Sequence, residues 1–402
     1  MTKSGRLLKF ALSFFLLGCS AHGQIWNQSD APSLSWQSIA GSLDGTKVVA
    51  VSVYDASTVN PGLIYTSTNG GQNWNLTSAP SNYWFSVASS ADGVRLVAGA
   101  NGDPGPGSPG PICLSTNGGS TWQTSSVPAN TWQAVASSTN GQILVGAAYG
   151  DGIYISTNFG ANWNLATNNV PTNNSWISLA VSGDGGKIFA TYIGGIYVST
   201  NTGATWTLPA TTIGSFWLPI ACSQDGRTVF AGIYGGSLYA STNSGTTWNQ
   251  NTNTTVNWQC LAMSTNGSTV FAGANGDSLY LSTNGGANWN LQSSASFLTP
   301  DSWQCNYCSA TGGSLVAGAT GDYIYFAVPV PVPTLQIQTV ASHAVISWPA
   351  SATADGFQLQ TIAVLQPAAS WTNITAGITQ IGTNSVYTNS LTASRAFFRL
   401  KK

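Results

Sequence analysis

Residues 217–250 read WLPIACSQDGRTVFAGIYGGSLYASTNSGTTWNQ, and this stretch decides the fold. It contains four short strand-like segments: 217–223, 228–232, 237–241 and 247–250. The first two are separated by Asp225-Gly226, a dipeptide that allows the positive φ angles of a two-residue hairpin turn. The stretch therefore predicts four antiparallel strands, which we call a, b, c and d in chain order.

The same pattern recurs along most of the chain. A Ser-Thr-Asn-x-Gly-x-x-Trp segment, which we call the box, lies between strands c and d and occurs six times, beginning at Ser67, Ser115, Ser156, Ser199, Ser241 and Ser282. A strand-a segment occurs seven times, beginning at Trp36, Trp84, Trp132, Trp176, Trp217, Trp258 and Trp303. Four strands per repeat of about 40 to 50 residues are typical of a β-propeller blade. We therefore predict an all-β fold containing a seven-bladed β-propeller.

The seventh repeat has no box and no strand d. It ends near Ala327, just ahead of the run Val-Pro-Val-Pro-Val-Pro at 328–333. At the other end of the chain, Ile-Trp-Asn-Gln at 25–28 matches Thr-Trp-Asn-Gln at 247–250. We predict that this N-terminal strand completes the seventh blade and closes the ring, so that the propeller spans residues 24–327.

The two ends of the chain are predicted to lie outside the propeller. Basic residues precede an apolar run at 10–17, a pattern typical of a signal peptide, here residues 1–23. Two alternatives remain: cleavage after Gly23, or a lipoprotein-type site that lipidates Cys19. Both predict an exported protein, which would be periplasmic, on the cell surface or secreted. No segment is long and apolar enough to be transmembrane.

The C-terminal segment has a different pattern from the repeats. Residues 328–333 predict a stiff, extended linker, because alternating proline restricts the backbone. Residues 334–402 follow, and the segments at 345–348 and 357–360 alternate as strands do. We expect this part to form a small β-sandwich-like domain.

The repeats resemble those of a known group of propellers. The six boxes are similar to Asp-box (BNR) repeats, which occur in sialidases, xyloglucan-cleaving glycosidases and the photosystem II assembly factor. The resemblance covers residues 24–327, and residues 334–402 resemble a fibronectin type III-like unit. The family's Asp is Asn in this chain, at Asn69, Asn117, Asn158, Asn201, Asn243 and Asn284. The resemblance implies a structural role for these residues, since an amide oxygen can also accept backbone N–H bonds.

Few residues in the propeller repeats suit catalysis. The chain contains no Glu, and its two His residues, His22 and His343, lie outside the repeats. We therefore expect no His-based metal site and no cofactor. The resemblance to sialidases implies an arginine triad, which Arg95 and Arg227 alone cannot supply.

A glycosidase would need two carboxyl groups at a cleft. Asp30 and Asp301 are the only candidates outside hairpin turns, because each precedes a strand a. We favour a non-catalytic protein and keep a glycoside hydrolase as the alternative. A third possibility is a purely structural surface protein.

Charge is sparse and unevenly placed. Charged residues make up 6% of the chain. Within residues 24–333 only four basic residues face eleven Asp, which excludes a nucleic-acid partner because that would need clustered Lys and Arg. The four bases all follow a–b turns: Lys47, Arg95, Lys187 and Arg227.

The two faces of the disk are predicted to differ. The a–b turns and the boxes should share one side, the box face, while the b–c turns and d–a links form the other, the b–c face. The b–c face is expected to carry acids without bases, namely Asp30, Asp55, Asp103, Asp151, Asp277, Asp301 and Asp322. We predict a binding site there for a glycan, a cation or a basic peptide, formed by Asp103, Asp151, Asp277, Asp322, Trp84 and Trp132. The partner would be a polysaccharide, a cation or a basic protein. Packing between blades is the alternative role for the two Trp residues.

Overall fold

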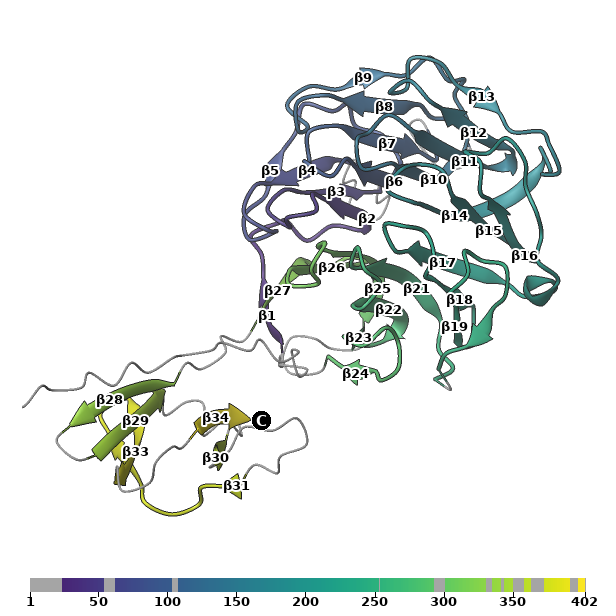
Figure 1. Ribbon diagram of the computed structural model, residues 1–402. Coiled ribbons are helices and arrows are strands. Elements are labelled where there is room, and N and C mark those ends of the chain that lie inside the picture. Colours follow the sequence, from purple (N-terminus) through teal and green to yellow (C-terminus); the bar gives the residue numbers. More distant parts are fainter. Residues whose placement is uncertain are drawn as a thin grey trace, which may run out of the picture. The chain divides into compact units, whose positions relative to one another are not determined.

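A computed structural model describes residues 24–53, 62–102, 108–252, 254–292, 301–329, 335–340, 343–349, 358–362, 372–390 and 397–401. Their regular secondary structure consists of β-strands, apart from one short 3₁₀ segment at Ala210–Thr212 (Figure 1). Contacts between Cα atoms divide the chain into a propeller, Gln24–Pro329, and a unit containing the described residues beyond it. Residues 1–23, with both predicted cleavage sites, lie outside the described part. In the described part no helix is long and apolar enough to cross a membrane.

Seven antiparallel blades follow one another around the propeller (Figure 1). The first three blades are β2 (Trp36–Gly41) to β5 (Asn75–Leu76), β6 (Trp84–Ser89) to β9 (Gln123–Thr124), and β10 (Trp132–Ser137) to β13 (Asn164–Leu165). The fourth is β14 (Asn174–Val181), β15 (Ile188–Tyr192) and β16 (Gly195–Ser199). The fifth and sixth are β17 (Trp217–Cys222) to β20 (Asn249–Gln250) and β21 (Trp258–Met263) to β24 (Asn290–Leu291). The seventh is β25 (Asp301–Cys308), β26 (Leu315–Ala319), β27 (Ile324–Pro329) and β1 (Gln24–Gln28).

The fourth blade differs from the predicted pattern. Its fourth strand is reduced to a single bridge between Val198 and Thr207. Pro209 follows two residues later and has no backbone N–H to extend the pairing. The chain turns instead through a short 3₁₀ segment at Ala210–Thr212.

Backbone hydrogen bonds between the a–b turns form a closed ring. Each a–b turn begins with a Ser, and the residue after that Ser donates its N–H to the carbonyl of the equivalent residue in the next blade, at 2.7 to 3.0 Å. The seven bonds run in order through Leu43, Ala91, Thr139, Gly183, Gln224, Thr265 and Ala310, and the last donates back to Leu43. The ring therefore contains seven blades, as the sequence predicts.

The N-terminal strand closes the seventh blade. β1 pairs antiparallel with β27 over five residues, from Gln24 opposite Pro329 to Gln28 opposite Tyr325. The strand thus extends two residues beyond the predicted boundary at Ala327, into the predicted Val-Pro linker. Proline is tolerated there because Pro329 ends its strand. Residues 330–333 lie outside the described part.

Each blade core is built around the Trp that opens strand a. Six of these indoles pack edge-on against a Tyr of strand c in the same blade, with ring centroids 5.2 to 5.7 Å apart. Strand b is buried along its length in β3 (Val48–Ser52), β7 (Leu96–Ala100) and β26, because neighbouring blades cover both of its faces. Aromatic contacts therefore stabilise each blade internally, and the buried side chains of strand b pack against the neighbouring blades.

The boxes are tight turns held by their own side chains. In all six, Ser Oγ donates to Asn Oδ1 at 2.9 to 3.0 Å. The same Asn oxygen accepts the backbone N–H four residues later, at 2.8 to 2.9 Å. The amide oxygens of Asn69, Asn117, Asn158, Asn201, Asn243 and Asn284 therefore satisfy backbone groups of the turn.

The C-terminal unit is a small β-sandwich. One sheet contains β28 (Gln336–Val340), β29 (His343–Pro349), β33 (Asn384–Ser390) and β32 (Ile378–Ile381). The other contains β31 (Thr372–Asn373), β30 (Gln358–Ile362) and β34 (Phe397–Lys401). Ile346, Trp348 and Leu359 are buried between the two sheets.

Trp26 is the side chain by which β1 is held in the ring. It is 3% exposed and stacks on Phe271 of the sixth blade at 5.6 Å. We expect Trp26→Ala to lower the free energy of unfolding by about 3–5 kcal/mol, through the lost contacts and the cavity left behind. Ile25→Ala, which alters a half-exposed neighbour, should change it by less than about 0.5 kcal/mol. Chemical unfolding of the two variants would test this, and equal midpoints would show that β1 does not close the ring.

The a–b turns predict how stability depends on pH. A Ser hydroxyl, followed by a backbone N–H, lowers the pKa of Asp44, Asp92, Asp184 and Asp225. Because the pKa is lower in the folded state, these groups contribute stability above the unfolded value, and the contribution is lost as pH falls through the folded value. In the third and sixth blades the same turn position is occupied by Asn140 and Asn266, whose side-chain oxygens accept the equivalent backbone N–H. Changing all four Asp to Asn should lower the free energy of unfolding at neutral pH. It should also make that free energy fall less steeply as the pH drops below about 4. Urea unfolding at several pH values measures both effects, and an unchanged acid decline would contradict the argument.

Candidate functional site

The hydrogen bonds confirm that the boxes and the a–b turns share a face. In six blades a box N–H donates to a carbonyl of the a–b turn in the same blade, as from Gly70 to Thr46. Two of the bases reach across this face, because Lys47 Nζ and Lys187 Nζ donate to the carbonyls of Asp92 and Asp225 in the next blade. The b–c turns, at the opposite ends of strands b and c, therefore form the other face.

The structure corrects the prediction for Trp84 and Trp132. Both indoles are 0% exposed, and the other five strand-a Trp residues are at most 1% exposed. Trp84 Nε1 donates to the Pro80 carbonyl at 3.1 Å, and Trp132 packs on Tyr154. These side chains fill the blade cores and cannot contact a ligand at the channel mouth.

Two of the predicted binding acids lie in b–c turns and are held by a tyrosine. Tyr154 donates its hydroxyl to Asp151 at 3.1 Å, and Tyr325 donates to Asp322 at 2.9 Å. Asp151 also accepts from Asn130 Nδ2 and from the backbone of Gly152. Burial, and then the charge of Asp151, raises the pKa of Tyr154. Both carboxylates are partly exposed, so their charge acts on the b–c face.

The remaining acids of this face are described only in part. Asp277 and Asp301 are opposite each other where β22 (Val270–Asp277) pairs with β25. Their side chains, and the whole of Asp55 and Asp103, lie outside the described residues.

Asp30 has a different place from the one predicted. Its carboxylate accepts the backbone N–H of Trp74 and Nδ2 of Asn73, each at 2.8 Å. These donors belong to the first box, so Asp30 joins the end of β1 to the first blade. Both carboxylate oxygens of Asp30 are thus occupied by the first box, which gives this residue a structural role in place of the predicted pairing with Asp301.

An exposed apolar patch on the b–c face was missed by the sequence analysis. It consists of Tyr149, Ile193, Ile213, Phe216 and Tyr234, each 38 to 59% exposed. Backbone pairing relates the first two of these residues. Tyr149 pairs with Ser175 at the start of β14, and the next residue of β14 pairs with Tyr192, which directly precedes Ile193. Ile193 bridges to Phe216, whose ring lies 5.5 Å from that of Tyr234. The five residues therefore come from the third, fourth and fifth blades, and Ile193, Phe216 and Tyr234 are direct neighbours.

The chemistry of these groups suits binding. Within the described ranges no cluster of three His, Cys, Asp or Glu could hold a metal ion. Burial raises the pKa of the Cys222 and Cys308 thiols to about 12, so neither is an ionised nucleophile near neutral pH. An apolar surface near the partly exposed carboxylate of Asp151 instead fits a ligand with apolar and positively charged groups.

The position of Asp30 predicts a structural effect. Asp30→Ala should lower the free energy of unfolding by about 1–3 kcal/mol, because two box donors lose their acceptor. Gln28→Ala, an exposed neighbour in β1, should have little effect. Thermal unfolding compares the two, and equal melting temperatures would mean that the Asp30 contacts contribute nothing to closure.

Comparison with known proteins supports the fold. No family model matches the sequence, and no curated protein does. A solved structure of YCF48 bound to D1 peptide matches with a TM-score of 0.58 and 15% identity, covering 77% of this chain and 98% of that one. YCF48 from Cyanidioschyzon merolae matches with a TM-score of 0.58 and 16% identity, covering 76% and 99%. At such identity the likeness concerns the fold alone, and this chain shares the β-propeller fold of those structures.

Proposed function

We propose that this protein is an exported, non-catalytic binding module whose b–c face binds a segment of a partner protein. The segment would carry aliphatic or aromatic side chains together with basic ones. The N-terminal signal peptide, or a lipid on Cys19, would place the propeller outside the cytoplasm. The C-terminal sandwich would serve as a spacer or attachment unit.

The exposed apolar patch is the observation that supports this function best. Isolated apolar side chains are common on protein surfaces, but a continuous group commonly marks an interaction site. Here Phe216 and Tyr234 lie side by side on adjacent strands, and Ile193 bridges directly to Phe216. Aromatic residues of this kind contribute strongly to binding at protein interfaces.

Charge favours a basic partner. Asp151 and Asp322 lie on the b–c face, whereas all four basic residues of 24–329 follow a–b turns on the box face. Such an imbalance steers positively charged segments toward the acidic side. A peptide is favoured over a bare cation, because three donors already surround the Asp151 carboxylate.

A related fold supplies further support. One of the matching propellers is recorded with a bound peptide, so the architecture can present a peptide-binding surface. The aliphatic side chains of Ile193 and Ile213 offer a glycan no hydrogen bonds, whereas they suit apolar peptide side chains. A polysaccharide is therefore the less favoured ligand for this patch.

Synthetic peptides would test the proposal. We expect peptides of about ten residues in which Leu or Phe alternates with Lys to bind the mature protein, and versions with Glu in place of Lys to bind less well. Phe216→Ser combined with Tyr234→Ser should weaken binding at least about tenfold. The matched control changes Leu76 and Leu291 to Ser, since these residues are somewhat more exposed and lie on outer strands of other blades.

Calorimetry on the variants decides between the outcomes. Equal losses in the patch and control variants would exclude the patch as the site. Equal affinity for Lys and Glu peptides would exclude the charge argument, and binding that is insensitive to salt would do the same. Binding of a neutral oligosaccharide at the patch, without peptide binding, would favour a glycan instead.

A further inference from the structure

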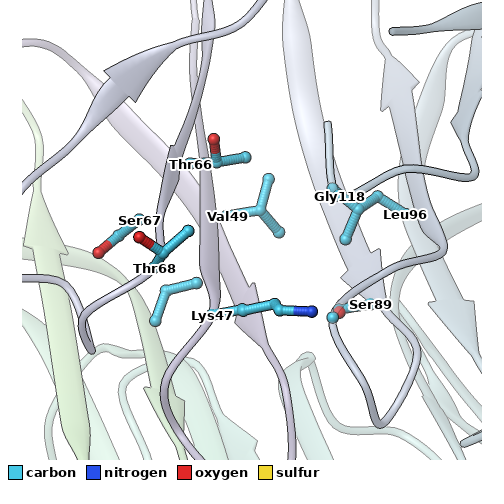
Figure 2. Close-up of a pocket in the computed structure, with 10 residues that line it drawn as sticks. Lys47, Val49, Thr66, Ser67, Thr68, Ser89, Leu96 and Gly118 are labelled. Carbon is cyan, nitrogen blue, oxygen red and sulfur yellow. The ribbon is translucent and has the colours of Figure 1, made fainter. Parts of the chain in front are cut away.

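Clefts open between neighbouring blades on the box face, and two of them can be compared directly. The cleft between the first two blades encloses about 260 Å³ and is lined by Lys47, Val49, Thr66, Ser67 and Leu96, among others (Figure 2). The Lys47 side chain crosses it, and Nζ donates to the Asp92 carbonyl at 2.9 Å. This cleft is small, and its basic residue already has an acceptor.

The cleft between the second and third blades is larger. It is a groove of about 1020 Å³, a volume that includes space open to solvent, and Arg95 takes the position that Lys47 has in the first blade. The backbone N–H of each donates to the Ser that begins its own a–b turn. The Arg95 guanidinium, however, lies over the ring of Phe159, 4.2 Å from its centroid. Within the described ranges it has no hydrogen bond or ion pair, so its five N–H donors remain open to the groove.

Phe159 is unusual for its place in the box. Its φ is 61°, in the left-handed region that favours glycine, and the first, second and sixth boxes have glycine there. The ring is 43% exposed on the surface. Thr202 and Ser244 adopt φ of 55° and 57° at the same position of the fourth and fifth boxes, so the conformation belongs to the box turn. The aromatic ring is what distinguishes the third box. The ring holds the guanidinium plane in the groove by a cation–π contact.

Uncharged polar side chains form much of the groove's walls, together with the apolar side chains of Leu96, Leu114 and Leu144. Hydroxyl and amide side chains line the walls, including Thr116, Thr121, Gln123, Thr124 and Ser126. No acidic residue is among the described lining residues, so nothing there neutralises Arg95. The groove thus combines one planar cation with many neutral hydrogen-bonding groups.

We propose that this groove binds an acidic oligosaccharide, with the carboxylate of a uronic acid paired to Arg95. The guanidinium fork matches the two oxygens of a carboxylate, and stacking on Phe159 fixes its orientation in advance. The hydroxyl and amide walls suit the hydroxyl groups of the flanking sugars. The groove lies on the box face, so this site is independent of the patch proposed to bind a protein segment.

The experiment measures binding of an oligogalacturonate to the mature full-length protein by calorimetry. We expect binding by the wild type and a loss of at least about tenfold with Arg95→Gln. Arg95→Lys should recover part of the affinity, because it restores charge without the planar fork. Arg227→Gln is the matched control, since it removes an exposed base from an a–b turn on the same face, and it should change affinity less than about twofold.

Phe159→Gly separates binding from folding. Glycine is favoured at that φ, so the melting temperature should hold or rise, while affinity falls because the guanidinium loses its support. Equal binding of the methyl-esterified oligosaccharide would overturn the carboxylate pairing. Equal losses of affinity in the Arg95 and Arg227 variants would show that binding depends on general surface charge, which would also overturn the proposal. Binding of a peptide carboxylate at Arg95, with none of oligogalacturonate, would overturn the assignment to a sugar.

Discussion

The ring of seven backbone hydrogen bonds between a–b turns is the constraint on which the rest of the propeller depends. Each turn supplies one donor and one acceptor, so the circle closes only when every blade is present. The turn that presents these groups is shaped by a buried Ser whose hydroxyl accepts a backbone N–H across the turn. These Ser side chains therefore set the shape of the turns, and the turns set the spacing of the blades. The other contacts between blades are largely apolar.

This ring also separates the two sides of the molecule. On the box face, the short a–b turns form hydrogen bonds with one another and with neighbouring basic side chains. The sequence of these turns therefore has little freedom to vary. On the b–c face, the connections contribute nothing to the ring, so their residues can differ between blades. Tyr149, Phe216 and Tyr234 are exposed on that face, and Phe216 and Tyr234 are in contact. Binding residues commonly occupy loops positioned by a rigid scaffold in this manner.

The sequence was sufficient to predict the features that repeat. The number of blades, the position of the boxes and closure by residues 25–28 all follow from matching segments, because segments with the same sequence pattern occupy equivalent places in their blades. Features that occur once were missed. Phe216 and Tyr234 stand outside the repeat pattern, and they meet where β17 and β18 of the fifth blade pair. Arg95 and Phe159 are distant in sequence and meet only because adjacent blades pack together. The error for Trp84 and Trp132 has another cause: an apolar residue on strand a can face either the blade core or the channel, and the spacing of residues alone does not distinguish the two.

Closure by β1 has a consequence for the order in which the protein can fold. β1 is the first propeller strand to be synthesised, and its partner β27 is the last. Each of the first six blades can form from contiguous residues as the chain emerges, whereas β1 must wait unpaired for the whole ring. Its closure carries the loop entropy of nearly the entire propeller and is the most non-local step in the fold. The last event of assembly is therefore the docking of the first strand, with Trp26 entering a site that the sixth and seventh blades have already prepared.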